Sequence, residues 1–187
     1  MMPARVIPFV GGVLVGAVLA LAPRLWAHAQ RALAPDTRPL VHTEHTFTFT
    51  VAAPADAVGP LFGANRERVW APGWHPRFLW PPDATDQPGM VFAVSHGHAS
   101  AIWVNTAFDL AGHFAQYVYT IPDVLVTTIS IRWLDQVDST HVTVRYDRTA
   151  LDPGANATVQ HMADHDAGAG PDWAQQINGY LKSPAHH

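Results

Sequence analysis

A succession of strand-length segments between residues 90 and 149 constrains this chain more than any other feature of its sequence. The segments span residues 90–96, 101–109, 113–121, 124–133 and 141–149, and short runs with Gly, Pro or Asp separate them. Connections this short join antiparallel neighbours, because a parallel pair needs a crossover of a dozen or more residues. The sequence therefore predicts an antiparallel meander.

The alternation of side chains predicts how this sheet is buried. In the last segment, Val142, Val144 and Tyr146 alternate with polar residues. Successive side chains of a strand point to opposite faces, so the apolar and the polar residues separate. This pattern is typical of an antiparallel sheet with one packed face and one solvated face.

A further strand and a short helical stretch precede the meander. Residues 45–51 alternate with threonines, which predicts a half-buried strand with one face formed by His45, Phe47, Phe49 and Val51. Pro54 then opens a helical stretch that extends to residue 62, because proline is tolerated in the first turn of a helix. Its inward-facing residues are expected to be Val58, Leu61 and Phe62.

The C-terminal part is predicted to be helical. Residues 156–182 have helical spacing, which the sequence Gly-Ala-Gly-Pro interrupts at residues 168–171. After the interruption, an apolar stripe at i, i+4, i+7 and i+8 consists of Trp173, Ile177, Tyr180 and Leu181. The order of elements predicts one α+β domain over residues 41–183, with the terminal helix packed on one face of the sheet.

Residues 67–76 form the segment richest in chemistry. They include Glu67, Trp70, Trp74 and His75, together with two prolines and a glycine. The prolines and the glycine prevent a continuous helix, so both indoles lie on a stiff, bent segment. Such a segment can line a pocket or fill an aromatic core, and the sequence leaves both interpretations open.

Composition excludes several classes of function. The 187 residues are 48% hydrophobic and 14% charged, with a formal net charge of -4. This is not the basic character of nucleic-acid-binding proteins, so no nucleic-acid partner is expected. The absence of cysteine excludes disulfides and thiolate catalysis, but it does not identify the compartment.

The N-terminal residues 1–29 are interpreted as a targeting segment. An apolar run at residues 6–22 follows a short basic start, and Ala27-His28-Ala29 resembles a cleavage site. A signal peptide cleaved after Ala29 predicts export to the periplasm or the extracellular space. The alternative is a retained membrane anchor, because the run approaches membrane-spanning length. Either way we expect the cell envelope, with residues 30–40 as a linker.

Three stretches of the chain resemble the START-like helix-grip superfamily, also called SRPBCC, which includes polyketide cyclase/dehydrase-like proteins. They are residues 47–58, residues 67–76 and residues 146–156, the last of which looks like an envelope-associated branch. The resemblance implies a curved antiparallel sheet wrapped around a long C-terminal helix, with two short helices after the first strand. It also implies a cavity for an apolar molecule or lipid. Carriers, cyclases, hydratases and regulators share this fold, so the resemblance fixes no reaction.

The first functional hypothesis is binding or carriage of a hydrophobic or aromatic small molecule, without a cofactor. The candidate ligand-binding residues are Trp70, Trp74, His75, Trp103, Asn105, Tyr117, Tyr119, Trp133 and Tyr146. Asn105 and Asp109 share strand parity with Trp103, so they would face the pocket if that face is concave. Each ring taken singly could equally belong to an ordinary core.

Two other hypotheses remain open. An enzyme of the cyclase/dehydratase type would transfer protons through Glu67, His75 or Asp109. A membrane-anchored accessory subunit would keep residues 1–29 beside a membrane-protein partner. As for metals, His96 and His98 would point to the same side of a continuous strand. A zinc site needs three or four ligands, so this pair is a weak candidate and no metal is expected.

Overall fold

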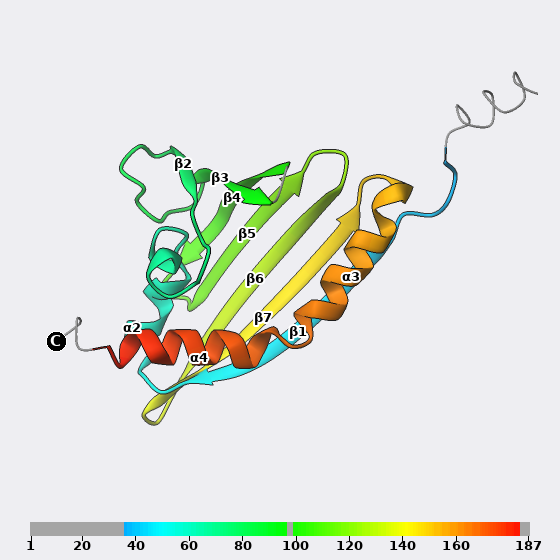
Figure 1. Ribbon diagram of the computed structural model, residues 1–187. Coiled ribbons are helices and arrows are strands. Elements are labelled where there is room, and N and C mark those ends of the chain that lie inside the picture. The colour runs from blue at the N-terminus through cyan, green and yellow to red at the C-terminus, as the bar shows by residue number, and fades with distance from the viewer. Residues whose placement is uncertain (1–35, 97–98, 184–187) are drawn as a thin grey trace, which may run out of the picture. The chain divides into compact units, whose positions relative to one another are not determined.

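The structure is a computed structural model that describes residues 36–96 and 99–183 (Figure 1). The segment interpreted as a signal peptide or anchor, residues 1–29, lies outside the described residues. Within the described part of the chain, no helix is long and apolar enough to span a membrane.

The described residues form a seven-stranded antiparallel sheet, which confirms the predicted meander. The strands lie in the order β1-β7-β6-β5-β4-β3-β2. Their bounds are β1 His42–Val51, β2 Arg77–Trp80, β3 Val91–His96, β4 Ala99–Asp109, β5 Phe114–Ile121, β6 Leu125–Gln136 and β7 Ser139–Ala150. The first and last strands pair along their full length, with Phe47 opposite Val144.

Three short helices connect the two edges of the sheet. They are α2 (Ala55–Val58), η1 (Gly59–Phe62) and η2 (Arg66–Val69). The predicted helical stretch to residue 62 corresponds to α2 and η1, and Val58, Leu61 and Phe62 are all buried as expected. This connection brings residues 66–76 across the concave face of the sheet (Figure 1).

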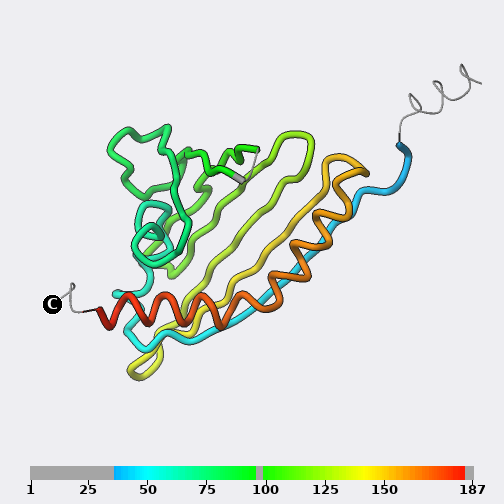
Figure 2. The backbone as a smooth tube through the Cα atoms, viewed as in Figure 1, coloured from blue at the N-terminus to red at the C-terminus, as the bar shows by residue number. Residues whose placement is uncertain are grey.

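The C-terminal residues form a short turn of η3 (Pro153–Ala155) and two helices, α3 (Asn156–Asp166) and α4 (Ala169–Leu181). Figure 2 shows both helices following β1. The predicted interruption is present, but it falls at residues 167–168, and Pro171 lies in the first turn of α4. A Cβ atom at Gly170 would lie 3.0 Å from the carbonyl oxygen of Thr48, so glycine permits α4 to approach β1 this closely.

Alternation along the strands places the core on the concave face. The inward positions of β6 are Leu125, Thr127, Ile129, Ile131 and Trp133, all buried, whereas the intervening residues are partly or fully exposed. Arg148 of β7 is also buried and donates to Asp166 of α3 at 2.7 Å. This ion pair ties α3 to the sheet, since a buried guanidinium requires a partner.

Two local features differ from the sequence-based expectation. The four-residue strand β2 was not predicted, because a run this short has no measurable periodicity and its pairing with β3 is irregular. The turn predicted at residues 135–139 is tighter in the structure, because β6 ends at Gln136 and β7 begins at Ser139. Asp138 in this two-residue turn has a positive φ of 61°, which suits a tight hairpin.

Candidate ligand-binding cavity

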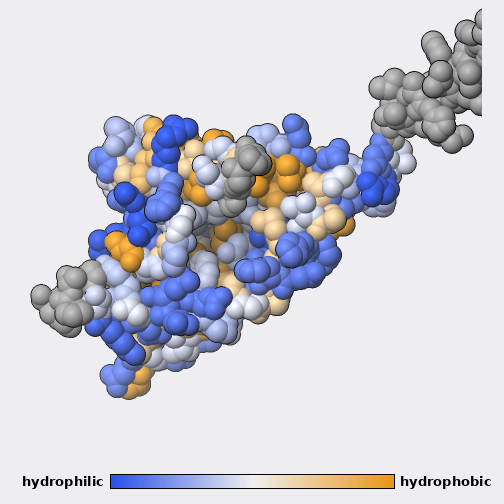
Figure 3. Space-filling model, in the orientation of Figure 1, coloured by the Kyte–Doolittle hydropathy of each residue, from blue (hydrophilic) through white to orange (hydrophobic). Residues whose placement is uncertain are grey.

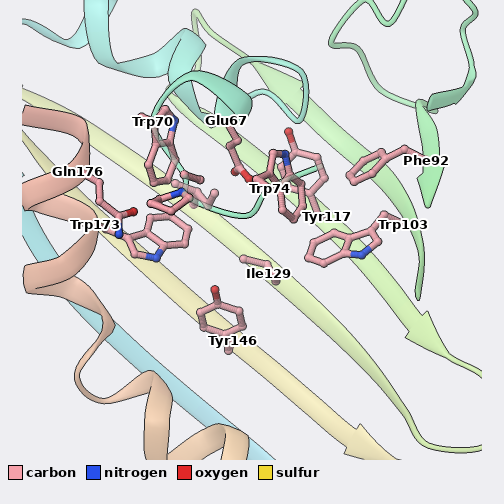
Figure 4. Close-up of a pocket in the computed structure, with 13 residues that line it drawn as sticks. Glu67, Trp70, Trp74, Phe92, Trp103, Tyr117, Ile129, Tyr146, Trp173 and Gln176 are labelled. Atoms are coloured by element: carbon pink, nitrogen blue, oxygen red, sulfur yellow. The ribbon is translucent and has the colours of Figure 1, made fainter. Parts of the chain in front are cut away.

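A cavity of about 260 Å³ lies between the concave face of the sheet, the segment after η2 and helix α4 (Figure 4). Its lining is mainly aromatic and consists of Glu67, Trp70, Ala71, Pro72, Trp74, Phe92, Trp103, Tyr117, Ile129, Ile131, Tyr146, Trp173 and Gln176. In the space-filling view, the surface is hollowed between β2–β4 and α4, and hydrophilic residues of α4 border the hollow (Figure 3).

Three of the lining aromatic side chains are fixed by the same short turn, residues 61–64. The indole nitrogens of Trp70 and Trp74 donate to the carbonyl oxygens of Leu61 and Ala64 at 2.8 and 2.7 Å. The hydroxyl group of Tyr117 donates to the carbonyl oxygen of Phe62 at 2.7 Å. The polar ends of these rings are therefore satisfied by backbone, and their apolar surfaces remain for the cavity.

Two pairs of neighbouring aromatic rings in the cavity lining meet at steep angles. Trp70 and Trp173 contact at 5.4 Å between ring centroids with 62° between their planes, and Trp74 and Trp103 contact at 5.3 Å with 87°. Tyr119 stacks on Trp103 at 4.2 Å. Tyr119 is not among the lining residues, so it supports a wall without forming one.

Glu67 is the acidic residue of the cavity. Residues 66–69 form a 3-10 turn that leaves Arg66 and Arg68 exposed, while the Glu67 side chain extends between Trp70 and Trp74 toward the cavity (Figure 4). Among the described residues, no hydrogen bond or ion pair holds its carboxylate. Burial, and next the nearby charge of Asp86, raise the pKa of Glu67 well above its usual value.

Two further polar side chains line the cavity. Tyr146 projects from β7, and burial is the main reason why the pKa of its hydroxyl group is raised, with smaller contributions from Asp166 and Glu67. Gln176 projects from α4 (Figure 4). Besides Tyr117, whose hydroxyl group is bonded to backbone, the cavity thus presents one carboxyl group, one phenol and one amide within aromatic walls, an arrangement typical of sites that orient a small molecule.

The structure brings together six of the residues that the sequence identified as candidates. These lining residues are Glu67, Trp70, Trp74, Trp103, Tyr117 and Tyr146. His75 is exposed and does not line the cavity. Trp133 is buried at another place on the sheet, where it packs against Phe62 and His113.

The two remaining candidates lie on either side of a β-bulge in β4. The register with β5 shifts between Asn105 and Ala107, so the two ends of β4 do not keep the same alternation. Asn105 is fully buried but does not line the cavity. Asp109 is exposed and accepts a hydrogen bond from the backbone nitrogen of Gly112 at 2.8 Å.

Several lining residues were not predicted. Trp173 belongs to the apolar stripe predicted for the terminal helix, and Gln176 is three residues further on, so this part of the wall was detectable from helical spacing. Phe92, Ile129 and Ile131 have inward positions on the strands. Nothing in their residue types distinguished them from the rest of the core.

The predicted histidine pair is not tested, because His98 lies outside the described residues and His96 is the last residue of β3 before them. Within the described residues, His42, Glu44 and Asp147 form a group with metal-ligand spacing. Arg145 already pairs with both carboxylates of this group, at 2.9 Å from Glu44 and 3.4 Å from Asp147.

No family model and no curated protein matches the sequence. Solved structures are nevertheless similar to the domain. Norcoclaurine synthase from Thalictrum flavum, in complex with dopamine and hydroxybenzaldehyde, has a TM-score of 0.58 at 13% identity over 77% of this chain and 90% of that chain. Ara h 8.0201 has a TM-score of 0.56 at 12% identity, over 75% and 98% of the two chains.

A bacterial protein of known structure is also similar to the domain. The Mll3558 protein from Rhizobium loti has a TM-score of 0.54 at 16% identity, over 77% of this chain and 100% of that chain. Identities this low establish the fold and not the activity. The expectation from the sequence is thereby confirmed at the level of the fold: the described domain has the helix-grip fold.

Proposed function

We propose that the protein binds a small aromatic or apolar molecule in the cavity between the sheet and α4, and acts as its carrier. The observation that carries this proposal is the anchoring of three lining side chains, Trp70, Trp74 and Tyr117, on residues 61–64. Because their polar atoms are already bonded, these rings offer a preformed apolar surface rather than hydrogen bonds.

The size of the cavity supports a compact ligand. An apolar cavity of about 150 Å³ holds a benzene molecule, so about 260 Å³ suits one substituted ring or a molecule of similar volume. The norcoclaurine synthase with this fold is in complex with dopamine and hydroxybenzaldehyde, which are small aromatic compounds. That likeness supports the proposed ligand class by analogy.

A larger side chain on the sheet that lines the cavity tests the proposal. Ile129 lines the cavity from β6, and Thr128 is its neighbour with the opposite orientation. We expect Ile129→Phe to weaken binding of phenol or benzaldehyde by about tenfold or more, because the added ring occupies the cavity. The matched variant Thr128→Phe should bind like the unmodified protein.

Tryptophan fluorescence and calorimetry measure the affinity, and native mass spectrometry of the full chain identifies any molecule that copurifies. Equal affinity in the Ile129→Phe variant would contradict binding at this cavity. Failure of the unmodified protein to bind any probe or to release any compound on denaturation would contradict the function itself.

A second candidate function is proton transfer to a bound ligand. Its specific support is Glu67, a cavity carboxyl group with a raised pKa and no partner among the described residues. His75 and Asp109 do not accompany it in the cavity. If Glu67→Gln keeps the affinity for the copurified compound and abolishes its turnover, the enzymatic alternative replaces the carrier.

A further inference from the structure

The ionisable charge among the described lining residues of the cavity is negative. Glu67 is an acid, and the described lining residues include no lysine, arginine or histidine. The nearby carboxylate of Asp86 adds to the negative potential at Glu67 instead of offsetting it. An ionised carboxylate in such a place is costly unless an opposite charge reaches it.

The walls around Glu67 also favour a positive charge. The face of an aromatic ring is the negative end of its quadrupole, and cations bind over tryptophan and tyrosine faces within about 6 Å of the centroid. Trp70 and Trp173 meet at 62°, so two rings of different orientation border the same space near Glu67 (Figure 4). Tyr146 approaches from the sheet below.

We propose that the cavity selects a small organic cation, a tertiary or quaternary ammonium compound, whose charge lies beside the Glu67 carboxylate among the rings of Trp70, Trp74 and Trp173. This inference rests on the proposed ligand-binding function of the cavity and assigns it a cationic class of ligand with a largely apolar surface. A trimethylammonium group fits the observations because its charge is spread over methyl groups, which pack against rings and need no hydrogen-bond acceptors.

An anionic ligand is disfavoured by the same charges. It would lie beside Glu67, where the nearby charge of Asp86 adds to the negative potential, with no basic residue among the described lining residues to receive it. A neutral ligand would fill the apolar space, but it would leave the Glu67 carboxylate without a partner when ionised. A cation therefore gives the carboxylate the partner that the described residues do not supply.

The proposed pairing makes binding depend on pH. The titratable groups that face Glu67 are Asp86, Tyr117 and Tyr146, and both phenols have raised pKa values, so they stay neutral near pH 7. A cation binds the ionised form of Glu67, so its affinity should rise as the pH rises through the raised pKa. A neutral hydrogen-bond acceptor should bind the protonated form and show the opposite slope.

Choline and 3,3-dimethyl-1-butanol test the inference, because they have the same shape and differ in the charged nitrogen. Calorimetry with the full chain between about pH 5 and about pH 8.5 compares their affinities. We expect choline to bind about tenfold or more tightly than the alcohol at the upper pH. Glu67→Gln should remove this preference, and Glu44→Gln, at an exposed carboxylate, should leave it unchanged.

The outcomes separate the inference from the function on which it rests. If the alcohol binds as tightly as choline at every pH, or if Glu67→Gln keeps the preference, the cation inference is overturned and the apolar cavity stands. If neither compound binds and phenol and benzaldehyde also fail, both proposals are overturned. A preference for choline that rises with pH and depends on Glu67 supports the inference.

Discussion

Glu67 lines the candidate site, and its ionisation opposes folding when the cavity holds no cation. Its pKa is raised well above 4.5 in the folded protein, mainly by burial. The unfolded chain therefore loses this proton at a lower pH than the folded chain does. Stability falls as the pH rises from the unfolded pKa to the folded pKa, and the effect is complete above the folded pKa.

We expect Glu67→Gln to be more stable than the unmodified protein, by a margin that grows with pH. The difference should increase by about 1.4 kcal/mol for each pH unit within that window, because one proton is involved. Urea unfolding at several pH values measures it. Glu44→Gln is the control, since its exposed ion pair with Arg145 contributes about 0–1 kcal/mol. Parallel pH profiles for Glu67→Gln and the unmodified protein would refute the assignment.

At the scale of single residues, the sequence showed which residue types could form the site more reliably than it showed which way a side chain points. The concentration of Glu67, Trp70 and Trp74 in one bent segment was visible in the sequence, and all three line the cavity. The bulge between Asn105 and Ala107 was not visible, because an extra residue in one strand changes no residue type. Parity counted across it therefore placed Asp109 on the same face as Trp103.

At the scale of elements, the position of α4 depends on the absence of a side chain at Gly170. A Cβ atom there would lie 3.0 Å from the Thr48 carbonyl oxygen and 3.3 Å from the Phe47 ring. Helix α4 carries Trp173 and Gln176 into the cavity wall. The close approach of α4 to β1 at Gly170 therefore helps to position Trp173 and Gln176 in the wall.

Gly170→Val should destabilise the domain by about 2 kcal/mol, as overpacked contacts do, and should also weaken binding of the aromatic probe. Gly168→Ala is the matched control, because a Cβ atom there would lie 3.8 Å from its nearest neighbour, the His165 carbonyl oxygen. Thermal unfolding and fluorescence titration give the two quantities. A Gly170→Val protein as stable as the Gly168→Ala protein would show that α4 tolerates displacement from β1.

The elements themselves were largely predictable. Alternating residues such as Val142 and Val144 indicate a strand directly, since the side-chain period of two is a local property. The four residues of β2 were too few to show that period. The pairing of β1 with β7 was not determined by local pattern, because it joins positions about a hundred residues apart. The resemblance to a known fold implied a curved antiparallel sheet but did not specify this pairing.

At the scale of the whole molecule, we predict that the N-terminal residues 1–29 direct the domain to the cell envelope. Export with cleavage after Ala29 stays our prediction, and N-terminal sequencing of the native protein should then read Gln30 first. Detection of residues 1–29 in protein extracted from membranes would contradict cleavage and favour the anchored accessory subunit. The described elements begin after this segment, with β1 at His42.

The attachment of three rings to residues 61–64 has a consequence for the adaptability of the protein. Residues 61–64 support the cavity wall through their backbone. They hold Trp70, Trp74 and Tyr117 by carbonyl groups that every residue type possesses. Substitutions in this turn that preserve the backbone should leave the walls in place, while changes at Phe92, Ile129 or Gln176 alter the interior. A designer seeking new ligand preferences could therefore vary the lining one position at a time without rebuilding its support.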